Sequence, residues 1–97
     1  MAFVQIIEFT TTRFDEMRKL FDEIRSVAGP QAPGRGMVCA DRDQPNRYMT
    51  IVEFPSYEEA MGNSERPETT AMAERMAALC DGPPTFRNLD VQEVVER

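Results

Sequence analysis

The chain has 97 residues, of which 41% are hydrophobic and 29% charged, and its formal net charge is −6 at pH 7. That length suffices for one modest core, so we expect a single domain over residues 1–97. An acidic chain is a poor nucleic-acid binder, because a basic surface is needed there. With no histidine and only two cysteines, zinc sites, histidine-ligated haem and a Ser-His-Asp triad are excluded.

Targeting and cofactor signals are missing from the sequence as well. No run approaches the ~18 apolar residues of a membrane span, and the first residues lack the basic region of a signal peptide. We therefore expect a cytoplasmic location and no membrane partner. Cys39 and Cys80 are expected to be reduced and buried as small hydrophobic residues. No glycine-rich phosphate loop or cluster of soft ligands is present, so no metal, flavin or haem is predicted.

The first predicted elements are a strand and a helix. Residues 3–9 (FVQIIEF) are rich in Phe, Val and Ile, which favours a short strand. Residues 13–29 predict an amphipathic helix, with Thr12 as its N-cap and a stop at Gly29 and Pro30. Its apolar positions recur at three- and four-residue steps: Phe14, Met17, Leu20, Phe21, Ile24 and Val27.

The second half of the chain repeats this pattern after a hairpin. A weak strand at 37–42 and a strand at 47–54 are joined by the turn DQPN. Ser56 and Glu59 match the S-x-x-E capping box and predict a helix start. That helix is weakened at 62–64 and restarts at Pro67, running to Cys80. Residues 85–96 (TFRNLDVQEVVE) alternate and predict the last strand.

The order of elements predicts the fold. A β-α-β-β-α-β succession is the ferredoxin-like arrangement of an α+β protein, with an antiparallel sheet ordered 4-1-3-2. An internal repeat supports this arrangement: VQIIEF (4–9) and MTIVEF (49–54) are nearly identical. These stretches are the first strands of two interlocked β-α-β halves. We expect them to lie side by side and antiparallel at the centre of the sheet.

Alternation along these two strands divides their side chains between two faces. One face is predicted to carry Gln5, Ile7, Phe9, Thr50, Val52 and Phe54. The other is predicted to carry Val4, Ile6, Glu8, Met49, Ile51 and Glu53. Both faces are largely apolar, but two helices cover only one. We therefore predict a homodimer that buries the second face, with Val4, Ile6, Met49 and Ile51 against the partner.

Two pairs of polar residues on these strands raise the question of a site. Glu8 and Glu53 could form a catalytic carboxylate pair, but pairing centred near Ile6 and Ile51 would keep them apart, which favours ion pairs with arginine. Gln5 and Thr50 lie on the helix-covered face, where an unbonded polar group is costly. They either bond each other or mark a position where water or a ligand satisfies them.

Near the end of the chain, TFRNLD contributes polar side chains whose role is open. Arg87, Asn88 and Asp90 could face a ligand, although inter-strand or intersubunit polar pairing is the safer interpretation.

The segment RYMTIVEFPSYEEAMGNSERPET (47–69) resembles the antibiotic biosynthesis monooxygenase-like family, and the likeness extends along nearly the whole chain. The resemblance implies a dimeric α+β barrel. In the quinone-forming and haem-degrading members, a tryptophan ends this strand, a histidine follows about nine residues later, and an asparagine lies on the first strand. Here these positions are Phe54, Asn63 and Gln5. Phenylalanine lacks the indole N–H, and asparagine neither shuttles protons near neutral pH nor ligates haem iron.

Two functions from different classes follow from the resemblance. The first is a small-molecule-binding protein, acting as an oxygenase without a cofactor on an aromatic or polyketide-like compound. The second is a non-catalytic dimeric ligand-sensing or accessory module. Asn63 could instead simply cap or interrupt its helix. The candidate ligand-binding residues are Gln5, Phe9, Thr50, Phe54 and Asn63.

Overall fold

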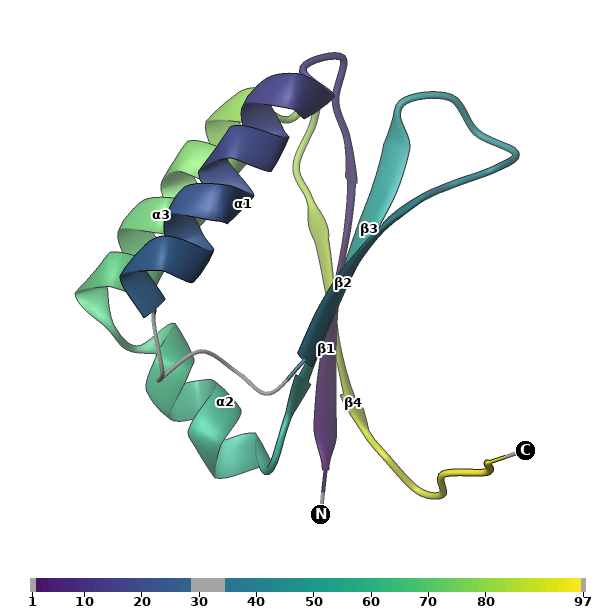
Figure 1. Ribbon diagram of the computed structural model, residues 1–97, viewed down its shortest axis with the longest axis vertical. Helices are drawn as coiled ribbons and strands as arrows, with labels where there is room; N and C mark the ends of the chain where they lie inside the picture. The colour runs from purple at the N-terminus through teal and green to yellow at the C-terminus, as the bar shows by residue number, and fades with distance from the viewer. Residues whose placement is uncertain (1, 29–34, 97) are drawn as a thin grey trace.

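The computed structural model describes residues 2–28 and 35–96. The elements follow in the order β1 (Phe3–Thr10), α1 (Phe14–Ala28), β2 (Arg35–Ala40), β3 (Arg47–Phe54), α2 (Tyr57–Ser64), α3 (Pro67–Leu79) and β4 (Thr85–Asp90). Figure 1 shows the three helices on one side of the sheet, with the other side uncovered. The predicted helix stop at Gly29 and Pro30 and the glycine/proline loop that follows lie outside the described residues.

The four strands form one antiparallel sheet in the order β2-β3-β1-β4, which is the predicted 4-1-3-2 order read from the other edge. Ile6 of β1 lies opposite Ile51 of β3, so the two copies of the repeat pair around their own centres. This confirms the ferredoxin-like α+β fold. The paired strands also place their side chains on the two faces as predicted, because directly opposed residues point to the same side.

The start of α1 differs from the prediction by one residue. The carbonyl of Arg13 accepts a hydrogen bond from Met17 N at 3.1 Å, so Arg13 and not Thr12 holds the N-cap position. The neighbouring Thr11 forms two hydrogen bonds at this corner. Its Oγ1 accepts from Arg13 N at 3.0 Å and donates to Leu79 O at 2.7 Å. Thr11 is 1% exposed. It therefore ties the β1–α1 corner to the end of α3.

The second helical segment is interrupted where its sequence is weakest. Ser56 caps α2, and its Oγ accepts from Glu59 N at 3.2 Å, as the capping box predicts. The helix ends at Ser64, and α3 restarts with Pro67 in its first turn. A proline is tolerated there because the first turn leaves its backbone nitrogens without intrahelical acceptors.

The core divides into two clusters along the sheet. We call the first the α1 cluster, and its buried members are Phe9, Met17, Leu20 and Met76. We call the second the α2 cluster, and its buried members are Phe3, Phe54 and Ala60. Aromatic pairs strengthen each: Phe9 stacks on Tyr48 with ring centroids 5.8 Å apart, and Phe3 meets the Tyr57 ring edge-on at 5.4 Å. Side chains that lie between the two clusters are therefore outside both groups of buried apolar residues.

The last strand is shorter than its sequence predicts. Asp90 pairs with Phe3, and Val91 N donates to Ala2 O at 3.0 Å. Beyond this point β1 offers no further partner, so residues 92–96 continue without regular structure although their composition favours a strand. In Figure 1 this yellow segment leaves the sheet on the side away from the helices.

The prediction for the cysteines is wrong for Cys39, which is exposed on the edge strand β2. Cys39 faces away from the helices, opposite Met49, and no helix covers that face. Cys80 is half-buried, and its Sγ donates to Met76 O at 3.2 Å. Burial, followed by the nearby charge of Asp81, raises the pKa of the Cys80 thiol.

Among the described residues, no helix is both long and apolar enough to cross a membrane.

Candidate functional site

A band of polar side chains separates the two core clusters on the helix-facing side of the sheet. Its members are Gln5 of β1, Thr50 of β3 and Asn88 of β4, and we call them the polar band. Gln5 lies opposite Asn88, and Thr50 lies opposite Ile7 and Val38. The band therefore runs across the sheet among apolar neighbours, between the α1 cluster and the α2 cluster.

Gln5 finds its partner on β4. Its Nε2 donates to Asn88 Oδ1 at 3.2 Å, which leaves Gln5 Oε1 as an acceptor and Asn88 Nδ2 as a donor. One of the two predicted alternatives, a hydrogen bond between Gln5 and Thr50, is therefore wrong. The reason is register: Gln5 is directly paired with Val52 on one side and Asn88 on the other. The inter-strand pairing expected for Asn88 is confirmed.

Thr50 is the unusual member of the band. The residue is 6% exposed, and Oγ1 forms no hydrogen bond with any described residue. A buried hydroxyl without a partner costs roughly 1–3 kcal/mol, so such groups are uncommon in folded proteins and call for an explanation. Its neighbour on β2, Val38, is 42% exposed. The hydroxyl thus lies close to the less covered edge of the sheet.

The remaining predicted site residues are not brought together. Phe9 belongs to the α1 cluster and Phe54 to the α2 cluster. Phe54 pairs with Phe3, so the two rings are separated along the strands by roughly 20 Å. Asn63 is half-buried on α2, and its carbonyl accepts from Arg66 N at 3.3 Å near the end of that helix. The aromatic residues therefore border the polar band from opposite ends.

The two glutamates of the opposite face are held apart, as expected from the pairing around Ile6 and Ile51. Glu8 pairs with Met49, and Glu53 pairs with Val4. Glu8 lies between two arginines, with Oε1 3.4 Å from Arg47 Nη2 and Oε2 3.3 Å from Arg87 Nη2. Its side chain is 17% exposed. The arrangement is an ion-pair row across three strands and not a carboxylate pair.

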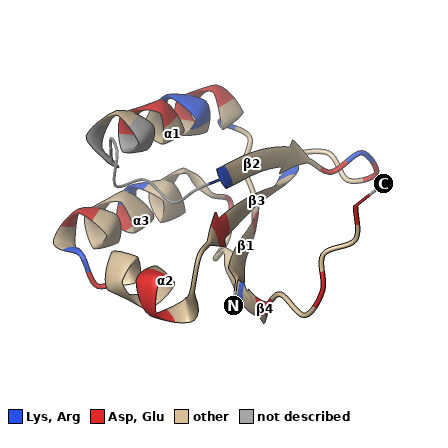
Figure 2. Cartoon of the chain, turned by 60° about the horizontal axis from the view of Figure 1, so that its bottom comes forward, with Lys and Arg blue, Asp and Glu red and all other residues tan. Residues whose placement is uncertain are grey.

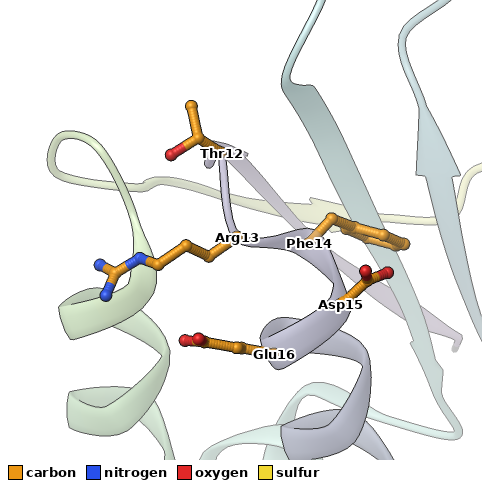
Figure 3. Close-up of a pocket in the computed structure, with 5 residues that line it drawn as sticks. All are labelled: Thr12, Arg13, Phe14, Asp15 and Glu16. Atoms are coloured by element: carbon orange, nitrogen blue, oxygen red, sulfur yellow. The ribbon is translucent and has the colours of Figure 1, made fainter.

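A hollow of about 350 Å³ lies away from these residues, at the start of α1. Figure 3 shows its lining residues, with Arg13 reaching toward the neighbouring helix and Phe14 toward the strands. Arg13 Nη2 donates to Ala78 O at 2.8 Å, and the Phe14 ring stacks on Tyr48 at 4.2 Å. Both side chains therefore have structural roles. Most of the lining is exposed, so the hollow offers little apolar enclosure to a ligand.

Metal-binding groups are not assembled in the described part of the chain. Within residues 2–28 and 35–96, no three acidic or cysteine side chains lie close enough together to hold a metal ion.

Several solved structures of other proteins have the same fold as this chain over nearly its whole length. SnoaB, a cofactor-independent oxygenase from Streptomyces nogalater, matches over 99% of this chain and 98% of its own, with a TM-score of 0.84 and 15% identity in one crystal structure of a variant. Rv0793 from Mycobacterium tuberculosis matches over 99% and 100%, with a TM-score of 0.79 and 11% identity. A protein described as an antibiotic biosynthesis monooxygenase matches over 96% and 100%, with a TM-score of 0.74 and 16% identity.

These likenesses confirm the predicted resemblance at the level of the fold. The chain has the fold of the antibiotic biosynthesis monooxygenase proteins along nearly its whole length. No protein-family model matches the chain, and no curated protein is significantly similar to it in sequence. With identities of 11–16%, its chemistry has to be argued from its own residues.

Proposed function

We propose that this protein binds a small aromatic or polyketide-like molecule at the polar band, on the helix-facing side of the sheet. The observation that carries the proposal is the unpartnered Oγ1 of the buried Thr50. A ligand that presents a hydroxyl or carbonyl oxygen to this group would satisfy it. Because threonine both donates and accepts, either oxygen type would serve.

The surroundings of Thr50 suit a flat apolar molecule with one polar side. Ile7 packs against the α1 cluster and Val52 against the α2 cluster, which supplies apolar contacts on both sides of the band. The free Oε1 of Gln5 and Nδ2 of Asn88 offer further hydrogen bonds. Ligand sites of this kind combine mostly apolar walls with a few placed polar groups.

Oxygenase chemistry without a cofactor is one use of such a site. In that reaction class the deprotonated substrate itself passes an electron to O₂, and the protein supplies shape and polar contacts. The likeness to SnoaB, described as a cofactor-independent oxygenase, supports this candidate. Phe54 and Asn63 would border the ligand here, in the positions that the resemblance implies.

The composition of the band favours a second candidate, a non-catalytic ligand-sensing module. Gln5, Thr50 and Asn88 do not titrate near neutral pH, and neither does Asn63. Among the described residues of the band, no general base is therefore available to remove a substrate proton. A substrate acidic enough to ionise unaided would be required for catalysis.

We further propose that the protein is a homodimer through the uncovered face of the sheet. Val4, Ile6, Met49 and Ile51 form the centre of this face, and each is half-buried in the single chain. On the outer strands, Met37 is 41% exposed and Leu89 is 46% exposed. A contiguous apolar face of this kind is typical of a protein interface.

The test of the binding site is the Thr50→Val variant, which keeps the shape of the side chain and removes the hydroxyl. Ligands are first identified by thermal shift with a panel of hydroxylated aromatic compounds. We expect the Kd of the best compound to rise at least tenfold in the variant. We also expect the variant without ligand to be as stable as the wild type or more stable by about 1 kcal/mol, because an unpaired buried hydroxyl is lost.

The matched control is Thr70→Val on the exposed surface of α3, which should change neither quantity. A less stable Thr50→Val protein with unaltered ligand affinity would contradict the binding site. Oxygen consumption with each bound compound then separates the two candidates, since the sensing module consumes none.

A further inference from the structure

The edge strand β2 presents small side chains toward the helices. Val38 lies directly opposite Thr50 in the register of β2 and β3, so it points to the helix-facing side of the sheet. Alternation places Gly36 and Ala40 on the same side. All three residues are exposed, and the apolar Val38 is 42% exposed. We call Gly36, Val38 and Ala40 the β2 shelf.

Gly36 keeps one end of the β2 shelf free of a side chain. A Cβ added at this position would lie 3.8 Å from Ile51 O, which is an ordinary van der Waals contact. The fold would therefore accept alanine here, and packing against β3 does not require a glycine. A glycine inside a strand often marks a position where a ligand approaches the backbone closely.

The β2 shelf is also uncharged. Arg35 begins the strand, but alternation points its side chain to the uncovered face. Figure 2 shows β2 in tan beyond this first residue. A charged group that rested on such a surface would lose part of its hydration without gaining a partner. The β2 shelf therefore favours the uncharged part of a molecule.

Thr50 borders the β2 shelf with a polar group that lacks a partner. Neighbouring strands are ~4.8 Å apart, so the buried Thr50 lies one strand interval from the exposed Val38. Its Oγ1 forms no hydrogen bond with any residue in the described part of the chain. An exposed apolar surface beside an unsatisfied hydroxyl supplies the two kinds of contact that a small-molecule site combines.

The opposite edge of the sheet is a poorer approach to Thr50. Ile7 of β1 and Phe86 of β4 lie in the same row as Thr50, so the β4 edge is two strand intervals away, or roughly 10 Å. The Phe86 ring and the hydrogen bond between Gln5 and Asn88 occupy that side of the sheet. A molecule arriving there would have to pass over both, whereas the β2 shelf leads directly to the hydroxyl.

We infer that a flat aromatic ligand lies with its rings on the β2 shelf and presents one oxygen to Thr50 from that edge of the sheet. Val38, at the centre of the β2 shelf, then determines how large a ring system fits. The inference rests on the proposed binding site and goes further, because it names the direction of approach and the residue that selects for size. It also restricts the ligand class to molecules with an oxygen on one edge and uncharged rings elsewhere.

The first experiment fills the β2 shelf. The probe is 2-naphthol, which carries a single hydroxyl on the edge of its fused rings, and its Kd is measured by isothermal titration calorimetry. Val38→Phe places a bulky ring where the probe should lie, and we expect the Kd to rise at least tenfold. Ala71→Phe adds the same ring on the exposed surface of α3 and should leave the Kd within about twofold.

The reverse change tests selection by size. Val38→Ala shortens the side chain and leaves more space above the β2 shelf. The second probe is 4-tert-butylphenol, whose tert-butyl group is thicker than a flat ring. We expect the ratio of its Kd to that of 2-naphthol to fall at least threefold in Val38→Ala. A purely structural role for Val38 would change both Kd values by the same factor, and such a result would overturn the inference.

Nuclear Overhauser effects locate the probe in the wild-type protein without any substitution. The ring protons of bound 2-naphthol should contact the Val38 methyl groups and the α-protons of Gly36. Contacts with the Phe86 ring in their place would show an approach from the β4 edge and would overturn the inference.

Failure of this inference differs from failure of the proposed binding site. Binding of 2-naphthol that is weakened by Thr50→Val but unchanged by Val38→Phe would overturn the role of the β2 shelf and leave the site at Thr50 intact. An equal Kd in wild type and Thr50→Val, or no binding of 2-naphthol at millimolar concentration, would overturn both.

Discussion

The two faces of the sheet are built from the same strands and differ in what covers them. On the helix-facing side, Phe3 and Phe9 are 2% and 3% exposed and belong to closed clusters. On the other side, Ile6 and Ile51 are only half-buried, between the Glu8 ion pairs at one end and Glu53 at the other. Alternation makes both faces apolar, but the chain has helices for one of them. An apolar face without helices is therefore available for another molecule.

The difference also determines where polar groups are tolerated. Glu8 on the uncovered face has two arginine partners. Thr50 on the covered face has none among the described residues. A charge at the rim of an open face is solvated as well as paired, whereas a hydroxyl beneath helices depends on a fixed partner. The unsatisfied group therefore points to function more strongly than the satisfied one.

The largest expected effect is on the covered face. Phe9→Ala removes a ring that contacts the α1 cluster and Tyr48, and should lower the free energy of unfolding by about 3–5 kcal/mol. Denaturant titration measures it. The control is Phe86→Ala on β4, because this ring is 51% exposed and should cost less than about 1 kcal/mol. Equal losses in both variants would contradict the contrast between core and edge.

The corresponding change on the uncovered face should act on association. Ile51→Asp places a carboxylate at the centre of the proposed dimer interface, where burial without a partner is costly. We expect the dimer Kd to rise at least 100-fold while the far-ultraviolet circular dichroism stays unchanged. Ser64→Asp adds the same charge on the exposed end of α2 and should leave the dimer intact. A dimer that survives Ile51→Asp must use a different surface.

A smaller effect is expected from the ion-pair row. Glu8→Gln removes the charge between Arg47 and Arg87 and should lower the free energy of unfolding by about 1 kcal/mol or less. The loss should shrink in high salt, since screening weakens such pairs. Glu53→Gln is the comparison, because Glu53 is exposed and outside this row. A larger loss from Glu53→Gln would show that the row contributes little.

The smallest effect concerns the pair that joins α1 to α3. Arg75 Nη1 donates to Glu23 Oε2 at 2.6 Å, and this hydrogen bond holds the pKa of Glu23 below its usual range. A depressed folded-state pKa contributes stability above the unfolded-state pKa, and the contribution is lost as the pH falls through the folded value. The Tm difference between wild type and Arg75→Ala should therefore be small at pH 7 and vanish in acid. A difference that grows on acidification would contradict this assignment.

Local sequence determined most of the fold. The repeat around Ile6 and Ile51 indicated the central strand pair, because the first strands of the two β-α-β halves lie side by side in this arrangement. The capping box at Ser56 and the proline at 67 placed the helix boundaries, since both act through the backbone of their own turn. The separation of Glu8 from Glu53 followed from the same register.

The partners of individual side chains were decided only by the tertiary structure. Gln5 bonds Asn88, 83 residues away in the chain, because β4 completes the sheet beside β1. Thr11, and not the predicted Thr12, forms the hydrogen bonds at the β1–α1 corner, because the end of α3 accepts its hydroxyl. The last strand stops at Asp90 because β1 begins at Phe3. Propensity and alternation are local properties, whereas a hydrogen bond or the end of a strand depends on which distant residue lies alongside.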